Sequence, residues 1–169
     1  MNTFVVGDER VSSTRIRELL AAGDLHQAAH YLGRPYTICG RVAHGDARGR
    51  TIGFPTANIN LHRKVSPLNG VYAVSVSGLG NAKVRGVANI GTRPTVKGDR
   101  RYLLEVHLFE FERDIYGAHV EVEFGIKLRD EKRFDSFEQL RRQIELDSMA
   151  AKQFFLTDDI NLKQQSDHP

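Results

Sequence analysis

A glycine-rich segment between His44 and Asn58 has the residue types of a phosphate-binding loop. Its glycines are spaced four residues apart, at Gly45, Gly49 and Gly53. Glycine tolerates positive φ and lets backbone N–H groups approach phosphate oxygens closely, and Arg48 and Arg50 would add positive charge. The spacing matches neither the Walker pattern nor the dinucleotide fingerprint. A flexible hairpin loop with exposed arginines therefore explains the same pattern.

The end of this segment, Pro55-Thr56-Ala57-Asn58, offers two oxygen ligands for a metal ion. Side chains alternate along a strand, so Thr56 and Asn58 would point to the same face. A hydroxyl and an amide carbonyl are hard ligands, and they could hold Mg²⁺ while nucleotide phosphates complete its octahedral shell. Alternatively, both residues satisfy a turn after the proline.

Glu105 is the candidate general base. It lies in an apolar, strand-like run, where an inward-facing acid would be unexpected unless it had a function. Alternation groups it with His107, Phe109 and Phe111, opposite Leu104, Val106 and Leu108. A general base must reach the proton that it removes. The alternative is an ordinary strand glutamate that faces solvent.

The elements that would position these residues fall into three zones. Residues 1–34 predict two short helices, from Ser12 or Ser13 to Gly23 and from Asp24 to Gly33, which together are too small to bury their apolar faces and should lean on another domain. Candidate strands follow at 36–44, 70–77, 84–89, 101–111 and 119–128, and they predict an antiparallel barrel. The third zone is a helix with a capping box of Asp135 and Glu138, which should end near Phe155 and pack on the barrel.

Six motifs, in order along residues 36–155, resemble those of riboflavin kinases. The first is the run from Gly45 to Asn58 described above. The others are Asn69-Gly70-Val71-Tyr72, Asn89-Ile90-Gly91-Thr92-Arg93-Pro94-Thr95, Leu104-Glu105-Val106-His107-Leu108, Ile115-Tyr116-Gly117 and Leu128-Arg129-Asp130-Glu131-Lys132-Arg133-Phe134. Any one of them could arise by chance, whereas six in the right order are specific.

The resemblance implies a mainly β fold, a six-stranded antiparallel Greek-key-like barrel with a long C-terminal helix and a short helical N-terminal segment. It implies an ATP-dependent kinase that converts riboflavin to FMN, with Glu105 as catalytic base and Thr56 and Asn58 as ligands of Mg²⁺. The nucleotide site would comprise Gly45, Gly49, Thr51, Gly53, Thr56 and Tyr116. Arg129 and Lys132, with Glu105, would lie beside the flavin.

The opening residues carry a second resemblance. The run Val11-Ser12-Ser13-Thr14-Arg15-Ile16-Arg17 is similar to a late motif of the FMN adenylyltransferase domain that precedes the kinase in bacterial FAD synthetases. No HxGH motif occurs in the sequence, so we expect no adenylyl transfer. The expected division is a remnant of that domain or linker at 1–34, a kinase module at 35–156 and a polar tail at 157–169. The missing domain would be the partner of the module.

Composition limits the other classes of function. The net charge of +3 and pI near 9.1 are too modest an excess to indicate a nucleic-acid binder. No secretory signal or membrane-length apolar run is present, so we expect a cytoplasmic protein without a membrane partner. An oligonucleotide-binding barrel would need exposed aromatics along a basic groove, yet Phe109 and Phe111 alternate with Glu110 and Glu112.

Three further points have interpretations that do not involve catalysis. His26 and His30 lie one helical turn apart, but Gln27 breaks the HExxH pattern, which favours a surface or interdomain pair over a metal site. Cys39, the only cysteine, excludes an internal disulfide and is expected to be a small core residue. A barrel that binds flavin without catalysis is the main alternative to a kinase.

Overall fold

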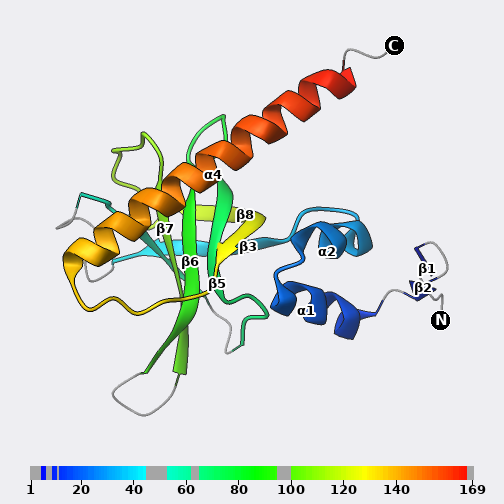
Figure 1. The fold of residues 1–169 in the computed structure, drawn as a ribbon, viewed down its shortest axis with the longest axis horizontal. Coiled ribbons are helices and arrows are strands. Elements are labelled where there is room, and N and C mark those ends of the chain that lie inside the picture. Colours follow the sequence, from blue (N-terminus) through cyan, green and yellow to red (C-terminus); the bar gives the residue numbers. More distant parts are fainter. Residues whose placement is uncertain are drawn as a thin grey trace.

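Short apolar runs separated by turns fold into a closed barrel of six antiparallel strands (Figure 1). The structure is a computed structural model that describes residues 5–6, 9–10, 12–44, 53–61, 65–94 and 100–166. The barrel strands are β3 (Thr37–Ala43), β4 (Ala57–Asn60), β5 (Gly70–Ser77), β6 (Val84–Pro94), β7 (Arg100–Leu108) and β8 (His119–Arg129). Their order around the barrel, β3-β4-β7-β6-β5-β8, is the expected Greek-key-like arrangement. Two short strands, β1 (Val5–Val6) and β2 (Glu9–Arg10), form a separate sheet that we did not expect.

Strand alternation decides which residues fill the barrel. Leu104, Val106 and Leu108 on β7 are buried in the interior core, where Leu104 pairs with Ile59 on one side and Ile90 on the other. Glu105 therefore lies on the outer face of the barrel, half-buried, and not in the interior. The catalytic candidates on this outer face are shielded from solvent only where another element packs against the barrel.

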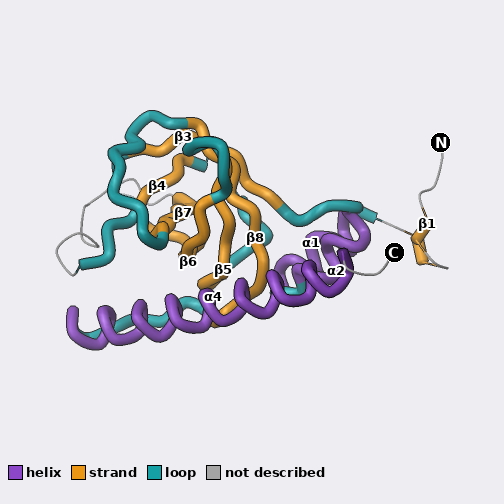
Figure 2. The backbone as a smooth tube through the Cα atoms, turned by 90° about the horizontal axis from the view of Figure 1, so that it is seen from above, coloured by secondary structure: helices purple, strands orange, loops and turns teal. Residues whose placement is uncertain are grey.

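One such element is the long helix α4 (Phe137–Ser166), which runs along the outside of the barrel (Figure 2). A second core lies between the helix and the outer faces of β5 and β6. Its buried residues are Val71, Ala73, Val87, Ala151 and Phe155. At Gly125 of β8 a side chain would collide with the ring of Phe154, so the glycine allows close packing there.

Both ends of α4 differ from expectation. The hydroxyl of Ser136 accepts a hydrogen bond from Gln139 N–H at 3.2 Å, and the Gln139 side chain accepts one from Asp135 N–H at 3.3 Å. The cap is therefore shifted by one residue from the predicted pair of Asp135 and Glu138. The helix continues through Ser166 rather than ending near Phe155.

The two N-terminal helices follow their predicted caps. Helix α1 (Ser13–Ala22) begins after Ser12 and ends at Gly23, and α2 (Leu25–Leu32) begins after Asp24 and ends at Gly33. The expectation that these helices need another surface to bury their apolar faces agrees with the structure, in which they pack against the barrel. Their buried residues, Leu19, Leu20, Leu25 and Ala28, belong to the same core as the barrel interior.

Two other observations concern the surface and the interior. Cys39 is exposed and its Sγ lies 3.5 Å from the Glu121 carboxylate, so the expected core position is wrong.

Tyr72 is buried inside the barrel and donates a hydrogen bond to the Asn69 carbonyl, and its burial raises its pKa to about 12. Within the described ranges no helix is long and apolar enough to span a membrane.

Candidate functional site

The predicted catalytic base and one predicted metal ligand are direct neighbours across the sheet. Asn58 on β4 pairs with Glu105 on β7, and Glu105 pairs with Asn89 on β6. Residues paired in this way point to the same face, with their Cβ atoms about 5 Å apart. The outer face of the barrel thus brings together two residues that are 47 positions apart in the sequence.

The same row continues to a predicted flavin contact. Asn89 pairs with Val71 on β5, and Val71 pairs with Arg129 on β8. The row therefore crosses five strands, from Asn58 through Glu105, Asn89 and Val71 to Arg129. With strands about 4.8 Å apart, its ends are separated by about 19 Å along the barrel surface. This span suits an elongated ligand lying across the strands.

The metal-ligand candidates are held by contacts with β7. Asn58 is buried, 8% exposed, while Thr56 is half-buried just before β4. His107 Nδ1 lies 3.0 Å from the Pro55 carbonyl, which can only accept, so Nδ1 carries the proton and donates. The His107 ring also meets the Phe54 ring edge-on at 5.2 Å. These contacts fix the backbone immediately before Thr56.

The oxygen donors fit a hard cation such as Mg²⁺, provided that a ligand supplies most of the coordination shell. A hydroxyl and an amide carbonyl are suitable but few. No group of three His, Cys, Asp or Glu side chains that could hold a metal occurs in the part of the chain that the structure describes. Phosphate oxygens are the obvious source of the remaining ligands.

The predicted nucleotide loop is described only at its two ends. Gly45, Gly49 and Thr51 lie outside the described residues. Before the loop, the His44 ring stacks on the half-exposed Tyr116 ring, with centroids 3.5 Å apart and planes at 20°. After it, Gly53 has φ +84°, a conformation that favours glycine. Because Ala43 pairs with Asn58, both ends of the loop start from neighbouring strands beside the candidate metal site.

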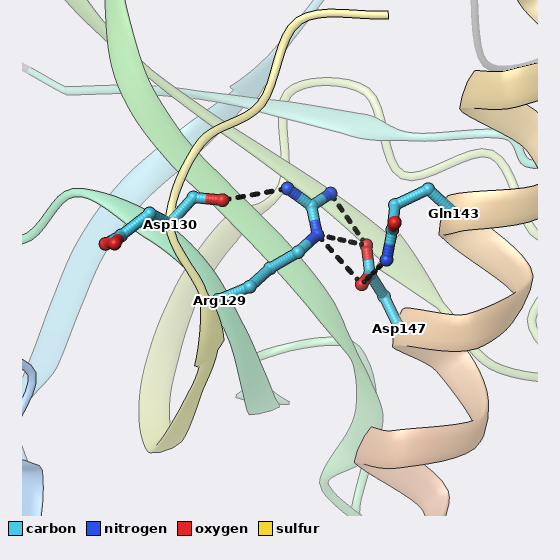
Figure 3. Close-up of polar contacts among 4 residues, drawn as sticks. All are labelled: Arg129, Asp130, Gln143 and Asp147. Atoms are coloured by element: carbon cyan, nitrogen blue, oxygen red, sulfur yellow. Dashed lines mark hydrogen bonds and ion pairs between the residues drawn. The ribbon is translucent and has the colours of Figure 1, made fainter.

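Arg129 is fixed by a carboxylate of the long helix (Figure 3). Its Nε and Nη2 donate to both oxygens of Asp147 at 2.8–3.1 Å, and its Nη1 donates to the Asp130 carbonyl at 2.9 Å. Gln143 donates a further hydrogen bond to Asp147 at 3.0 Å. Asp147 is 5% exposed, so this fork is largely shielded from water. It joins β8, the segment after β8 and α4 at the end of the row.

Lys132 is exposed and lies near Arg129, because both side chains contact the ring of Phe134. Its Nζ lies 6.0 Å from the centre of the Phe134 ring, and the Arg129 guanidinium lies 5.7 Å from it. Lys127 donates a 2.6 Å hydrogen bond to Asp130, and this bond and the lysine charge lower the pKa of the Asp130 carboxyl. Arg129, Lys132 and the Phe134 ring thus lie close together at this end of the row.

Sequence reasoning missed several residues of this arrangement. Asp147 was not considered, although it lies four residues before Ala151 and eight before Phe155, on the apolar stripe of α4. An acid in a core-facing stripe is a signal, because it needs a buried partner. Phe134 and Asn89 belonged to motifs without a role, and His107 was assigned only to the face of Glu105.

The chain matches known proteins along most of its length. The riboflavin kinase (flavokinase) family profile matches residues 32–155. The bifunctional riboflavin kinase/FMN adenylyltransferase of Escherichia coli K12 is 54% identical over 153 residues, 90% of this chain and 49% of that protein. The chain spans about half the length of the bifunctional relatives that it matches.

Solved structures give the same picture of the fold. A riboflavin kinase from Trypanosoma brucei superposes with a TM-score of 0.52 at 27% identity, covering 72% of this chain and 80% of that one. A Streptococcus pneumoniae protein described as a macrolide-efflux protein superposes with a TM-score of 0.76 at 40% identity, covering 86% of this chain and 47% of that one. The six-stranded antiparallel barrel with a long C-terminal helix is thus confirmed.

Proposed function

The chain belongs to the riboflavin kinase family, and from this premise we propose that it transfers the γ-phosphoryl group of ATP to riboflavin. The terminal hydroxyl of the ribityl chain attacks phosphorus, the bond to the β-phosphate oxygen breaks, and the products are FMN, ADP and a proton. The observation that carries the proposal is the row in which Glu105 stands between Asn58 and the flavin-side residue Arg129.

In this proposal Glu105 takes the proton of the attacking hydroxyl. It lies next to Asn58, so a hydroxyl within its reach is also close to phosphates held at the metal ligands. General-base positioning of this kind contributes about 10²–10⁴-fold. The rest of the rate acceleration comes from alignment and from stabilising the charge of the transferring group.

Thr56 and Asn58 would hold Mg²⁺, which when bound neutralises charge on the transferring phosphates. Gly45, Gly49, Thr51 and Gly53 would line the phosphates from the loop, with Tyr116 on the nucleotide side. Arg129 and Lys132 would lie beside the flavin. Among the described residues Arg129 donates through Nε and Nη2 to Asp147 and through Nη1 to the Asp130 carbonyl, so one further N–H group on each of Nη1 and Nη2 would be available to a ligand there.

The relatives' name pairs this activity with FMN adenylyltransferase. We propose that such a domain is the partner of this module and uses its FMN as substrate. The need for ATP points to the cytoplasm as the place of action.

The test is chromatographic detection of FMN and ADP from riboflavin and MgATP. We expect FMN formation that stops with EDTA and falls about 10²–10⁴-fold in Glu105→Gln, with riboflavin affinity largely retained. Glu112→Gln, an exposed acid outside the row, is the matched control and should keep full activity. Equal loss of binding and rate in Glu105→Gln would identify a structural residue. Riboflavin binding without FMN formation by the unmodified chain would identify a flavin-binding module instead.

A further inference from the structure

Asn89 has a buried side-chain oxygen that nothing in the described structure uses. It lies in the middle of β6, on the outer face, between Glu105 of β7 and Val71 of β5. Its Oδ1 exposes less than 1 Å² and has no hydrogen-bond partner among the described residues. Side-chain oxygens in this condition are uncommon, because burying an acceptor without a donor destabilises the folded state.

The surroundings of Asn89 do not explain its residue type. The neighbouring outward residues Val71 and Val87 are apolar and pack under α4. An apolar side chain at position 89 would continue that packing without an unpaired acceptor. The carboxamide oxygen thus has no donor in the described contacts, which favours a donor that arrives with a ligand.

The neighbouring charges restrict the kind of donor. Glu105 is the cross-strand neighbour of Asn89. On the same strand, two residues further, a Cβ at Gly91 would collide with the Glu131 carboxylate, so this carboxylate, from the segment after β8, lies against β6 at this point. With carboxylates from two directions, an anionic group is disfavoured next to Asn89. A hydroxyl can donate to Oδ1 and stay neutral.

We propose that Asn89 Oδ1 accepts a hydrogen bond from an inner hydroxyl of the ribityl chain and so selects flavins that carry a polyol. This inference rests on the proposed function. Neighbouring strands are about 4.8 Å apart, so a chain whose terminal hydroxyl reaches Glu105 brings its inner hydroxyls over Asn89 on the way to Arg129. Asn89 would then hold the chain in line for attack, as a binding and positioning residue.

The experiment compares two ligands by titration of flavin fluorescence. Riboflavin carries the polyol, whereas lumiflavin has the same ring system with a methyl group in its place. In Asn89→Leu, which keeps the branched shape without an acceptor, we expect riboflavin to bind roughly 10- to 100-fold more weakly and lumiflavin to bind as before. Asn60→Leu, an exposed position on the outer face of β4, should change neither affinity.

Three further results decide the matter. The melting temperature of ligand-free Asn89→Leu should equal or exceed that of the parent chain, since no paired acceptor is lost. Equal weakening of both ligands, or of neither, overturns the proposal. A riboflavin effect that disappears with EDTA also overturns it, because Asn89 would then act through a metal ion. Failure of the kinase proposal is recognised separately, by riboflavin binding in the parent chain without FMN formation.

Discussion

Arg129 is oriented before any ligand binds. A long cationic side chain loses conformational freedom when it is immobilised on a ligand, and a side chain that is already fixed avoids this loss. Here both oxygens of Asp147 hold the guanidinium, and Gln143 holds Asp147. In the proposed site the carboxylate would thus act on the flavin end through Arg129, without itself being placed next to the ligand.

Asp147→Asn tests this arrangement at the level of one residue. The amide keeps the shape but loses the charge and one acceptor, and Arg129 is 22% exposed, so water compensates in part. We expect the free energy of unfolding in urea to fall by about 1–3 kcal/mol, together with weaker riboflavin binding.

Glu145→Gln is the matched control, because it removes an exposed acid of the same helix that pairs with Arg141. Exposed pairs contribute little, so its stability should stay within about 0.5 kcal/mol of the parent. An Asp147→Asn chain with unchanged stability and unchanged riboflavin affinity would mean that Arg129 is held by other groups.

At the scale of single residues, the sequence predicts the face of a strand on which a residue lies better than it predicts the residue's neighbours on other strands. Alternation placed Glu105 opposite Leu104 and Val106, which the structure confirms. The pairing of Glu105 with Asn58 and Asn89 depends on strand register, which closure of the barrel determines and which a local pattern does not contain. The roles of Thr56, Asn58 and Glu105 in catalysis stay predictions.

Among the elements, β7 holds the segment that carries the candidate metal ligand Thr56. Its outer residue His107 donates to the Pro55 carbonyl and touches the Phe54 ring, so the strand fixes the segment that leads into β4. Thr56 follows directly, and its position therefore depends on a contact between two elements rather than on β4 alone.

His107→Phe tests whether this contact affects the candidate metal site without affecting the proposed flavin end of the site. The phenyl ring can keep the contact with Phe54 but cannot donate to Pro55. We expect the KM for MgATP to rise roughly 2- to 10-fold, the value of one net hydrogen bond, with riboflavin affinity unchanged. His119→Phe, on the exposed face of β8, is the control. A riboflavin affinity that falls as much as that for MgATP would show that His107 supports the whole face.

The elements themselves were largely predictable. The residue pattern located five of the six barrel strands. The sixth was considered only as a short extended segment at Thr56 and Asn58, with a turn as the alternative, and the resemblance implied the full number of strands. Strand β4 has four residues, too few for a periodic signal. The end of α4 was predicted too early because polarity was taken as a stop, yet residues 156–166 contain neither glycine nor proline to end a helix.

Taken as a whole, the molecule joins its N-terminal helices and its barrel through one interior core. Leu20 and Ala28 are almost fully buried in the same cluster as Leu104 of the barrel. The expectation that the N-terminal helices need another surface came from their short length, which does not reveal which surface that is. Elements that share a core are expected to unfold together.

Leu20→Ala tests whether helices and barrel form one cooperative unit. Leu20 is 1% exposed, so its truncation leaves a cavity and should lower the free energy of unfolding by about 2–5 kcal/mol. Because the cavity lies in the shared core, we expect a single transition in urea, with helical circular dichroism and riboflavin binding lost at the same lower concentration. Leu162→Ala, 58% exposed on α4, should stay within about 0.5 kcal/mol of the parent. Two transitions in Leu20→Ala, with riboflavin binding following only the later one, would mean that the N-terminal helices are an independent attachment and that the barrel and α4 alone hold the site.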